Sequence, residues 1–237
     1  MNMKKTILDL AHDLISLFYP MTCCACGTAL VRGEKTLCTN CSMKMPKTNF
    51  HKIRNNLVEK CFWGRVQIEV ATSYFFFVKN SDFQHMLHKL KYKGRSDIGV
   101  FLGKRFGNDL ISQPEFCHFD AIIPVPLHPD KLKKRGYNQS EMVAQGLSQS
   151  MKVPVNTVSL IRKTFTETQT RKSRIERWEN VKEVFEATPA INLNDKHVLI
   201  VDDVLTTGAT IEGCANALLS QFPNVKISVA TLAFAHN

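Results

Sequence analysis

The chain has 237 residues, of which 44% are hydrophobic and 22% are charged. This composition is typical of a folded globular protein and excludes a disordered one. The length accommodates one α/β domain of ordinary size and a small appendage. The formal net charge of +10 predicts attraction to polyanions such as phosphorylated metabolites, nucleic acid or acidic membranes, without selecting among them.

Residues 1–20 are predicted to form a helix, because apolar side chains recur at helical spacing from Ile7 to Phe18 and Pro20 follows. The lysines before this run resemble the start of a signal peptide. However, Asp9 and Asp13 interrupt the apolar run and no small-residue cleavage site follows. No segment is long and apolar enough to span a bilayer. We therefore expect a cytoplasmic protein without a membrane span.

Residues 21–61 form a cysteine-rich, basic segment with no clear helical or strand period. It contains two Cys-x2-Cys pairs, made of Cys23, Cys26, Cys38 and Cys41. Each pair can place two thiolates on one tetrahedral metal ion, and metal binding would supply much of the stability of so small a segment. Structural zinc is the favoured interpretation. Disulfides and redox chemistry are weaker alternatives, and Cys24 could replace Cys23 as a ligand if the register shifts.

Residues 62–237 show an α/β pattern. One helix is expected after a cap at Ser81, and a second over residues 97–112. Glycine recurs every fourth residue in the second helix, which predicts a close helix–helix contact; these residues are Gly99, Gly103 and Gly107. Three apolar runs predict buried parallel strands, at Ala121–Pro126, His197–Val201 and Lys226–Ala233. Because ligands bind at the carboxyl ends of such strands, the loops after the first two are the expected sites.

The second of these strands leads into two carboxylates, a turn rich in threonine and glycine, and a helix predicted from Ile211 to Leu219. Main-chain N–H groups of the turn can hold a phosphate, and glycine allows its close approach. The carboxylates can accept hydrogen bonds from ribose hydroxyls or orient water around Mg²⁺. The predicted binding residues for a ribose 5-phosphate are Asp202, Asp203, Thr206, Thr207, Gly208, Ala209 and Thr210.

Other protein classes match this pattern less well. A P-loop NTPase needs a Gly-x4-Gly-Lys-Ser/Thr loop, which the chain lacks. A response-regulator receiver domain needs more residues than follow Asp203. A strand, turn and helix that bind no ligand remain an alternative.

Residues 198–210 resemble the phosphoribosyl pyrophosphate motif of type I phosphoribosyltransferases, and nearly the whole chain resembles the ComF family of competence-associated proteins. Further stretches carry this resemblance, in the order in which the family has them: residues 23–27, 88–94, 124–128, 135–139 and 169–181. The resemblance implies an α/β fold with a type I phosphoribosyltransferase core, a parallel sheet flanked by helices, and a small N-terminal zinc ribbon.

By the same resemblance, the loop after the Ala121–Pro126 strand would contact pyrophosphate. The residues implied are Lys131, Arg135, Gly136, Tyr137, Asn138 and Gln139. Pyrophosphate needs cations and hydrogen-bond donors, and four basic side chains lie within residues 131–135. For any single lysine here, a solvated surface position is the alternative.

Residues 162–182 are also basic. In related transferases a mobile loop in this region closes over the active site, and the implied positions are Gln169, Arg177 and Asn180. Closure would exclude water from a reactive sugar cation. The same segment could instead contact nucleic acid, and the sequence does not separate the two hypotheses.

Two functional hypotheses follow. In the first, a ComF-type protein binds phosphoribosyl pyrophosphate with Mg²⁺ and acts in DNA uptake during natural transformation, with single-stranded DNA and the DNA-uptake helicase machinery as partners. In the second, it is an active type I phosphoribosyltransferase that displaces pyrophosphate with an unidentified nucleobase or amine. The sequence shows no element that would recognise a base, so it names no acceptor.

Overall fold

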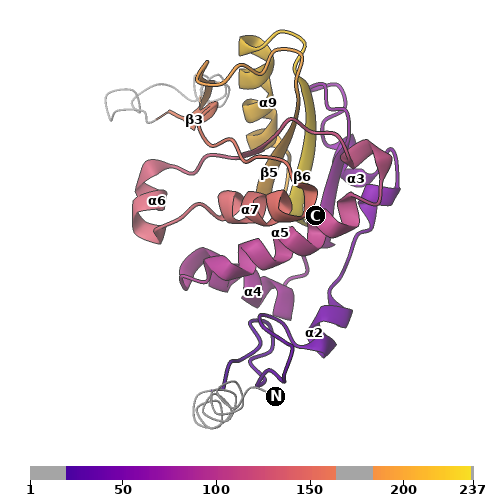
Figure 1. Ribbon diagram of the computed structural model, residues 1–237, viewed down its shortest axis with the longest axis vertical. Helices are drawn as coiled ribbons and strands as arrows, with labels where there is room; N and C mark the ends of the chain where they lie inside the picture. The colour runs from indigo at the N-terminus through magenta and orange to yellow at the C-terminus, as the bar shows by residue number, and fades with distance from the viewer. Residues whose placement is uncertain (1–19, 164–183, 236–237) are drawn as a thin grey trace, which may run out of the picture.

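The computed structural model describes residues 20–163 and 184–235 (Figure 1). The helix predicted over residues 1–20 therefore lies outside the described residues, apart from Pro20. The predicted loop residues Gln169, Arg177 and Asn180 also lie outside them.

The core is a four-stranded parallel sheet with the strand order β1-β6-β5-β2. Its strands are Ala71–Phe76 (β1), Ala121–Pro124 (β2), His197–Leu205 (β5) and Lys226–Phe234 (β6). The three parallel strands expected from the apolar runs are all present. Sequence reasoning missed β1, which pairs with β6 at the edge of the sheet.

Strand β5 lies between β6 and β2 and is covered on both faces. Its residues from Val198 to Val201 have no exposed surface, which explains why they form a continuous apolar run and not an alternating one. The strand was expected to end at Val201, but its pairing with β6 continues to Leu205. Asp202 and Asp203 therefore lie within the paired strand and not in the loop after it.

Helices cover the two faces of the sheet (Figure 1). On one face lie Asp82–Tyr92 (α4), Ser96–Leu110 (α5) and Gln139–Met151 (α7), and on the other lies Ala209–Gln221 (α9). The predicted cap is confirmed, because Ser81 Oγ accepts a hydrogen bond from the N–H of Gln84 (3.2 Å). The smaller elements are Thr39–Lys44 (α2), Phe50–Lys52 (η1), Leu57–Lys60 (α3), Pro114–Phe116 (η2), Pro129–Arg135 (α6) and the antiparallel pair Leu160–Arg162 (β3) and Phe185–Ala187 (β4).

The segment between residues 20 and 62 packs against both sides of the core. Cys24 and Leu37 belong to the same hydrophobic cluster as α4 and α5. Phe50 and Val58 belong to the cluster on the α9 face. The predicted domain boundary between residues 61 and 62 stays a prediction. No helix in residues 20–163 or 184–235 has the length and apolar character needed to cross a bilayer.

Helices α5 and α7 make the close contact that the glycine pattern predicted. A Cβ atom on Gly103 would lie 2.2 Å from the carbonyl oxygen of Val143, and one on Gly146 would lie 2.2 Å from that of Val100. These obstacles are main-chain atoms, which cannot move aside as a flexible side chain would. Only glycine fits at either position.

We predict that Gly103→Ala destabilises the fold by about 1–3 kcal/mol or more, because the added methyl overpacks the contact and outweighs the roughly 1 kcal/mol that alanine gains in helix propensity. Urea denaturation of the purified variant measures this change. Asn108→Ala, at an exposed position of the same helix, is the control and should be close to wild type. A Gly103→Ala variant as stable as Asn108→Ala would show that the helices can separate freely.

Candidate functional site

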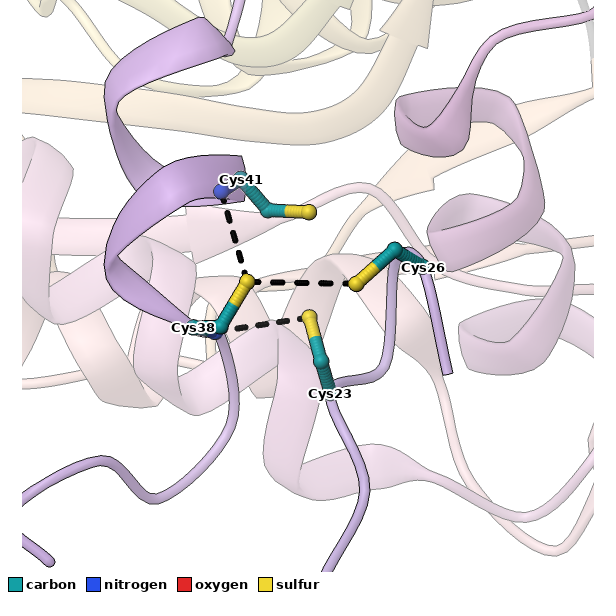
Figure 2. Close-up of side chains that lie close together, drawn as sticks. All are labelled: Cys23, Cys26, Cys38 and Cys41. Atoms are coloured by element: carbon teal, nitrogen blue, oxygen red, sulfur yellow. Dashed lines mark hydrogen bonds between the residues drawn. The ribbon is translucent and has the colours of Figure 1, made fainter. Parts of the chain in front are cut away.

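The four cysteines of the two predicted pairs converge. Figure 2 shows Cys23, Cys26, Cys38 and Cys41 pointing toward one another. Their sulfur atoms all lie within 4.8 Å of one another, and those of Cys26 and Cys38 are 3.8 Å apart. Tetrahedral zinc with Zn–S bonds of about 2.3 Å requires sulfurs ~3.8 Å apart. The cluster therefore has the size and the soft ligands that zinc requires.

Main-chain groups support the cluster. The N–H of Cys38 donates to Cys23 Sγ and the N–H of Cys41 donates to Cys38 Sγ, both at 3.4 Å. A hydrogen bond shared with Thr28 lowers the pKa of Cys26 to about 6. Such donors favour the thiolate form that a metal binds.

Cys24 lies outside this cluster. Its side chain is buried, and burial, followed by the neighbouring Cys23, raises the pKa of its thiol to about 12. The sulfur atoms that lie within 4.8 Å of one another include that of Cys23 and not that of Cys24. The geometry therefore favours Cys23 over Cys24 as the fourth ligand.

The acidic pair in β5 is held by contacts from two helices. Asp202 Oδ1 accepts a hydrogen bond from Ser140 Oγ at the start of α7 (2.8 Å) and another from the N–H of Asp203 (2.8 Å). Asp203 Oδ2 forms an ion pair with Lys91 Nζ in α4 (3.0 Å). Burial, followed by the charge of Asp203, raises the pKa of Asp202 to about 7. The two carboxylates therefore have different surroundings, one with neutral donors and one with a cation.

The turn after β5 exposes Thr206, Thr207 and Thr210. The N–H groups of Thr206, Thr207 and Gly208 donate to no other described residue, so they can receive an anion at the start of α9. Gly208 has a positive φ of 82°, and a Cβ atom there would lie 3.1 Å from the Phe62 ring. Both observations explain why glycine stands at this position.

Arg65 holds the turn from its other side. Its Nη1 donates to the carbonyl oxygen of Thr207 (2.6 Å), and its Nη2 forms an ion pair with Glu212 in the first turn of α9. The carbonyl group of Thr207 therefore points toward a cation supplied by the protein. This orientation leaves the amide side of the turn for a ligand.

A cleft of about 430 Å³ lies between the end of α4 and helix α6. Its lining is mostly basic and consists of Lys91, Tyr92, Gly94, Lys131, Lys134 and Arg135. The guanidinium of Arg135 lies 5.4 Å from the centre of the exposed Tyr92 ring. A cleft lined by four cations is suited to a polyanion such as pyrophosphate.

Only Lys131 and Arg135 of the predicted pyrophosphate residues line this cleft. Gly136 ends α6 with a φ of 83°, and Tyr137 donates through its hydroxyl to the carbonyl of Leu90. Asn138 caps α7 and donates to the carbonyl of Val125 (2.9 Å), and Gln139 is buried. The side chains of Tyr137 and Asn138 thus hold the loop in place, and contact of residues 136–139 with pyrophosphate stays a prediction.

Sequence reasoning missed three residues that contact the site. Ser140 directly follows the predicted pyrophosphate residues, so the boundary was drawn one residue short. Lys91 lies in residues 88–94, a stretch that carried the family resemblance but received no role. Arg65 gave no signal in the sequence, because it reaches a turn 142 residues away along the chain.

The parallel sheet, with an acidic pair near the carboxyl end of the inner strand β5 and a threonine-rich turn before a helix, defines a phosphoribosyltransferase-type domain. In agreement, residues 138–237 match the family model described as phosphoribosyl transferase domain. The chain is 30% identical over 201 residues to DNA utilization protein YhgH of Shigella flexneri, which covers 83% of each chain. The chain therefore belongs to the ComF and YhgH family of phosphoribosyltransferase-domain proteins.

The chain is also similar to two competence proteins and to a solved structure. Competence protein F of Haemophilus influenzae is 36% identical over 104 residues, which are 42% of this chain and 44% of that protein. Competence protein ComFC of Bacillus subtilis is 23% identical over 215 residues, 86% of each chain. Among solved structures, the glutamine phosphoribosylpyrophosphate amidotransferase of B. subtilis matches with a TM-score of 0.41 and 20% identity, over 60% of this chain and 30% of its own.

We predict that the purified protein contains about one zinc ion per chain, and that Cys38→Ser loses it because three thiolates cannot complete a tetrahedral site. Metal analysis by mass spectrometry measures the content. Cys24→Ser and Cys117→Ser, which remove thiols outside the cluster, should keep the metal. Loss of zinc from Cys24→Ser with retention in Cys23→Ser would reverse the ligand assignment.

We also predict that Asp202→Asn stabilises the protein at about pH 8, and that this gain shrinks as the pH falls toward 5. The pKa of Asp202 is raised to about 7 in the fold, so its ionisation destabilises the folded state as the pH rises through that value, whereas the protonated form carries no such cost. Urea denaturation across this range measures the gain, with the exposed Asp195→Asn as control. If Asp202→Asn raised the free energy of unfolding by the same amount at every pH, this result would contradict the raised pKa of Asp202.

Proposed function

We propose that the chain binds phosphoribosyl pyrophosphate, or a related ribose 5-phosphate, between the acidic pair and the basic cleft, and that it acts in DNA uptake. The observation that carries this proposal is the position of Lys91. It contacts Asp203 and also lines the cleft. A group that binds ribose hydroxyls and a group that binds anions therefore lie side by side, as a phosphorylated sugar requires.

Each part of the ligand would meet a suitable group of the protein. The amides of residues 206–210 would hold the 5-phosphate at the start of α9. Asp202 and Asp203 would accept hydrogen bonds from the ribose hydroxyls. Lys131, Lys134 and Arg135 would neutralise the pyrophosphate in the cleft. The side chain of Ser140 would keep the Asp202 carboxylate oriented through the hydrogen bond that it donates.

Two metals belong to this proposal. Structural zinc would be bound by Cys23, Cys26, Cys38 and Cys41, whose spacing fits a tetrahedral ion. Magnesium would be bound through one or two carboxylates of the acidic pair together with ligand oxygens, which is a common mode for this ion. When bound, magnesium would neutralise charge on the pyrophosphate.

The role in DNA uptake is supported by the relatives. Their names are DNA utilization protein YhgH, competence protein F and competence protein ComFC. A cytoplasmic protein that receives single-stranded DNA from the uptake machinery, including its helicase, would use basic surfaces for the phosphates. The residues that line the cleft supply such a surface, and the basic segment 162–182 is a second candidate.

We predict that phosphoribosyl pyrophosphate with Mg²⁺ binds the wild-type protein in calorimetric titration, and that Asp202→Asn/Asp203→Asn weakens this binding at least roughly tenfold. Lost hydrogen bonds to two charged acceptors justify this size, since each is worth about 1.5–3 kcal/mol and tenfold is about 1.4 kcal/mol. Asp195→Asn, an exposed aspartate away from the acidic pair, is the control. Equal heats from all three proteins would refute the site.

Two additions to the same experiment separate the functional hypotheses. Pyrophosphate release in the presence of candidate nucleobases and amines would identify an active phosphoribosyltransferase, and its absence would favour a binding role. Single-stranded DNA should bind with an affinity that falls steeply with salt if phosphate contacts dominate. An affinity independent of salt would contradict a role for the basic surfaces.

A further inference from the structure

Lys91 is a cation at the acidic pair that comes from outside the sheet. Its Nζ lies 3.0 Å from Asp203 Oδ2, and only 27% of the lysine side chain and 14% of the aspartate side chain are exposed. Exposed ion pairs contribute little because solvent and salt screen them. This pair is largely shielded from solvent, so screening weakens it less than it would weaken an exposed pair.

The main chain that leads to Lys91 is anchored. The preceding residue, Leu90, is completely buried, and its carbonyl oxygen accepts a hydrogen bond from the Tyr137 hydroxyl. The helix that carries Lys91 begins at the Ser81 cap, 10 residues before it. A lysine on such an anchored turn loses less conformational freedom in forming an ion pair than one on a mobile surface.

The acidic pair has few other cations or metal ligands. Within residues 20–163 and 184–235, the cysteine cluster is the only group of three or more His, Cys, Asp or Glu side chains arranged to hold a metal. Asp202 has neutral donors, the hydroxyl of Ser140 and the N–H of Asp203. Asp203 has Lys91. The negative charge of a carboxylate that already has an ammonium partner is partly neutralised. Such a carboxylate depends less on a metal ion than a carboxylate without a cationic partner does.

We propose that Lys91 is a resident cation of the ligand site: its ammonium neutralises Asp203 where the ribose meets the pyrophosphate, and so reduces the dependence of binding on Mg²⁺. This inference rests on the proposed function of the same site. Lys91 lies at the junction between Asp203 and the cleft that contains Lys131, Lys134 and Arg135. It is a positioning residue that balances charge, and it takes no part in a bond-breaking step.

The test compares the affinity for phosphoribosyl pyrophosphate with Mg²⁺ and with EDTA in calorimetric titration. In Lys91→Met, the ratio of the two affinities should rise roughly tenfold over wild type, because only the metal then neutralises Asp203; tenfold corresponds to about 1.4 kcal/mol. Lys91→Arg keeps the charge and should restore the wild-type ratio. Lys93→Met removes an equal charge from an exposed lysine two residues away that does not line the cleft, and should leave the ratio unchanged.

A double-mutant cycle separates the action of Lys91 on Asp203 from a direct contact with ligand phosphates. In Asp203→Asn the ion pair with Lys91 is gone and the lysine charge keeps only its smaller effect on Asp202, so adding Lys91→Met should change the metal ratio much less than it does in the wild-type background. If Lys91→Met raises the ratio equally in both backgrounds, the lysine acts on the ligand and the inference is overturned. A ratio in Lys91→Met within about twofold of wild type also overturns it.

Failure of this inference is distinguishable from failure of the proposed function. A wild-type protein that gives no heat with Mg²⁺ or with EDTA refutes the ligand site itself. A wild-type protein that binds, with a metal ratio that Lys91→Met does not change, refutes only the role of Lys91. Thermal denaturation of Lys91→Met and Lys91→Arg shows whether each variant is folded, and a folded Lys91→Arg keeps the charge comparison valid if the methionine variant is unstable.

Discussion

The parallel pairing of β5 with β2 and β6 is the constraint on which the candidate site depends. Parallel strands end at the same edge of a sheet, and the register aligns Pro124 with Val201. The N–H of Val125 then donates to the carbonyl of Val201 (2.9 Å), and the carbonyl of Val125 accepts from Asn138 (2.9 Å). The cap of α7 is thereby fixed beside β5. The hydrogen bond from Ser140 to Asp202 is a consequence of that strand register.

The same arrangement explains how two adjacent carboxylates can occupy one partly buried place. Two like charges side by side, away from water, are costly unless donors or cations compensate them. The protein compensates them differently. Asp202 receives neutral donors and has its pKa raised to about 7, whereas Asp203 receives the ammonium of Lys91. Titratable groups that are adjacent in sequence but differ in environment can take different roles toward a ligand.

Sequence reasoning succeeded where the signal is local. The buried parallel strands, the Ser81 cap, the glycine face of α5 and the four converging cysteines each follow from spacing within one segment. It failed where contacts between segments distant in sequence determine the structure. The extension of β5 to Leu205 depends on pairing with β6, and β1 is rich in aromatic residues but has no alternating pattern, since it is buried along almost its whole length. Lys91 and Arg65 reach the site from helices or turns distant in sequence, and no local pattern marks such contacts.

The cysteine cluster and the acidic pair lie apart, but helix α4 connects them. Cys23 and Cys41 belong to the same hydrophobic core as Phe83, Leu87 and Leu90, and Cys41 Sγ lies 4.0 Å from Asp82 Oδ2 in the first turn of the helix. Lys91 lies at the other end of this helix. Because this helix is continuous from Asp82 to Tyr92, the cysteine segment supports the same helix that carries Lys91. A metal that orders the cysteine segment would therefore stabilise the start of the helix whose other end places the ammonium beside Asp203, without touching the ligand.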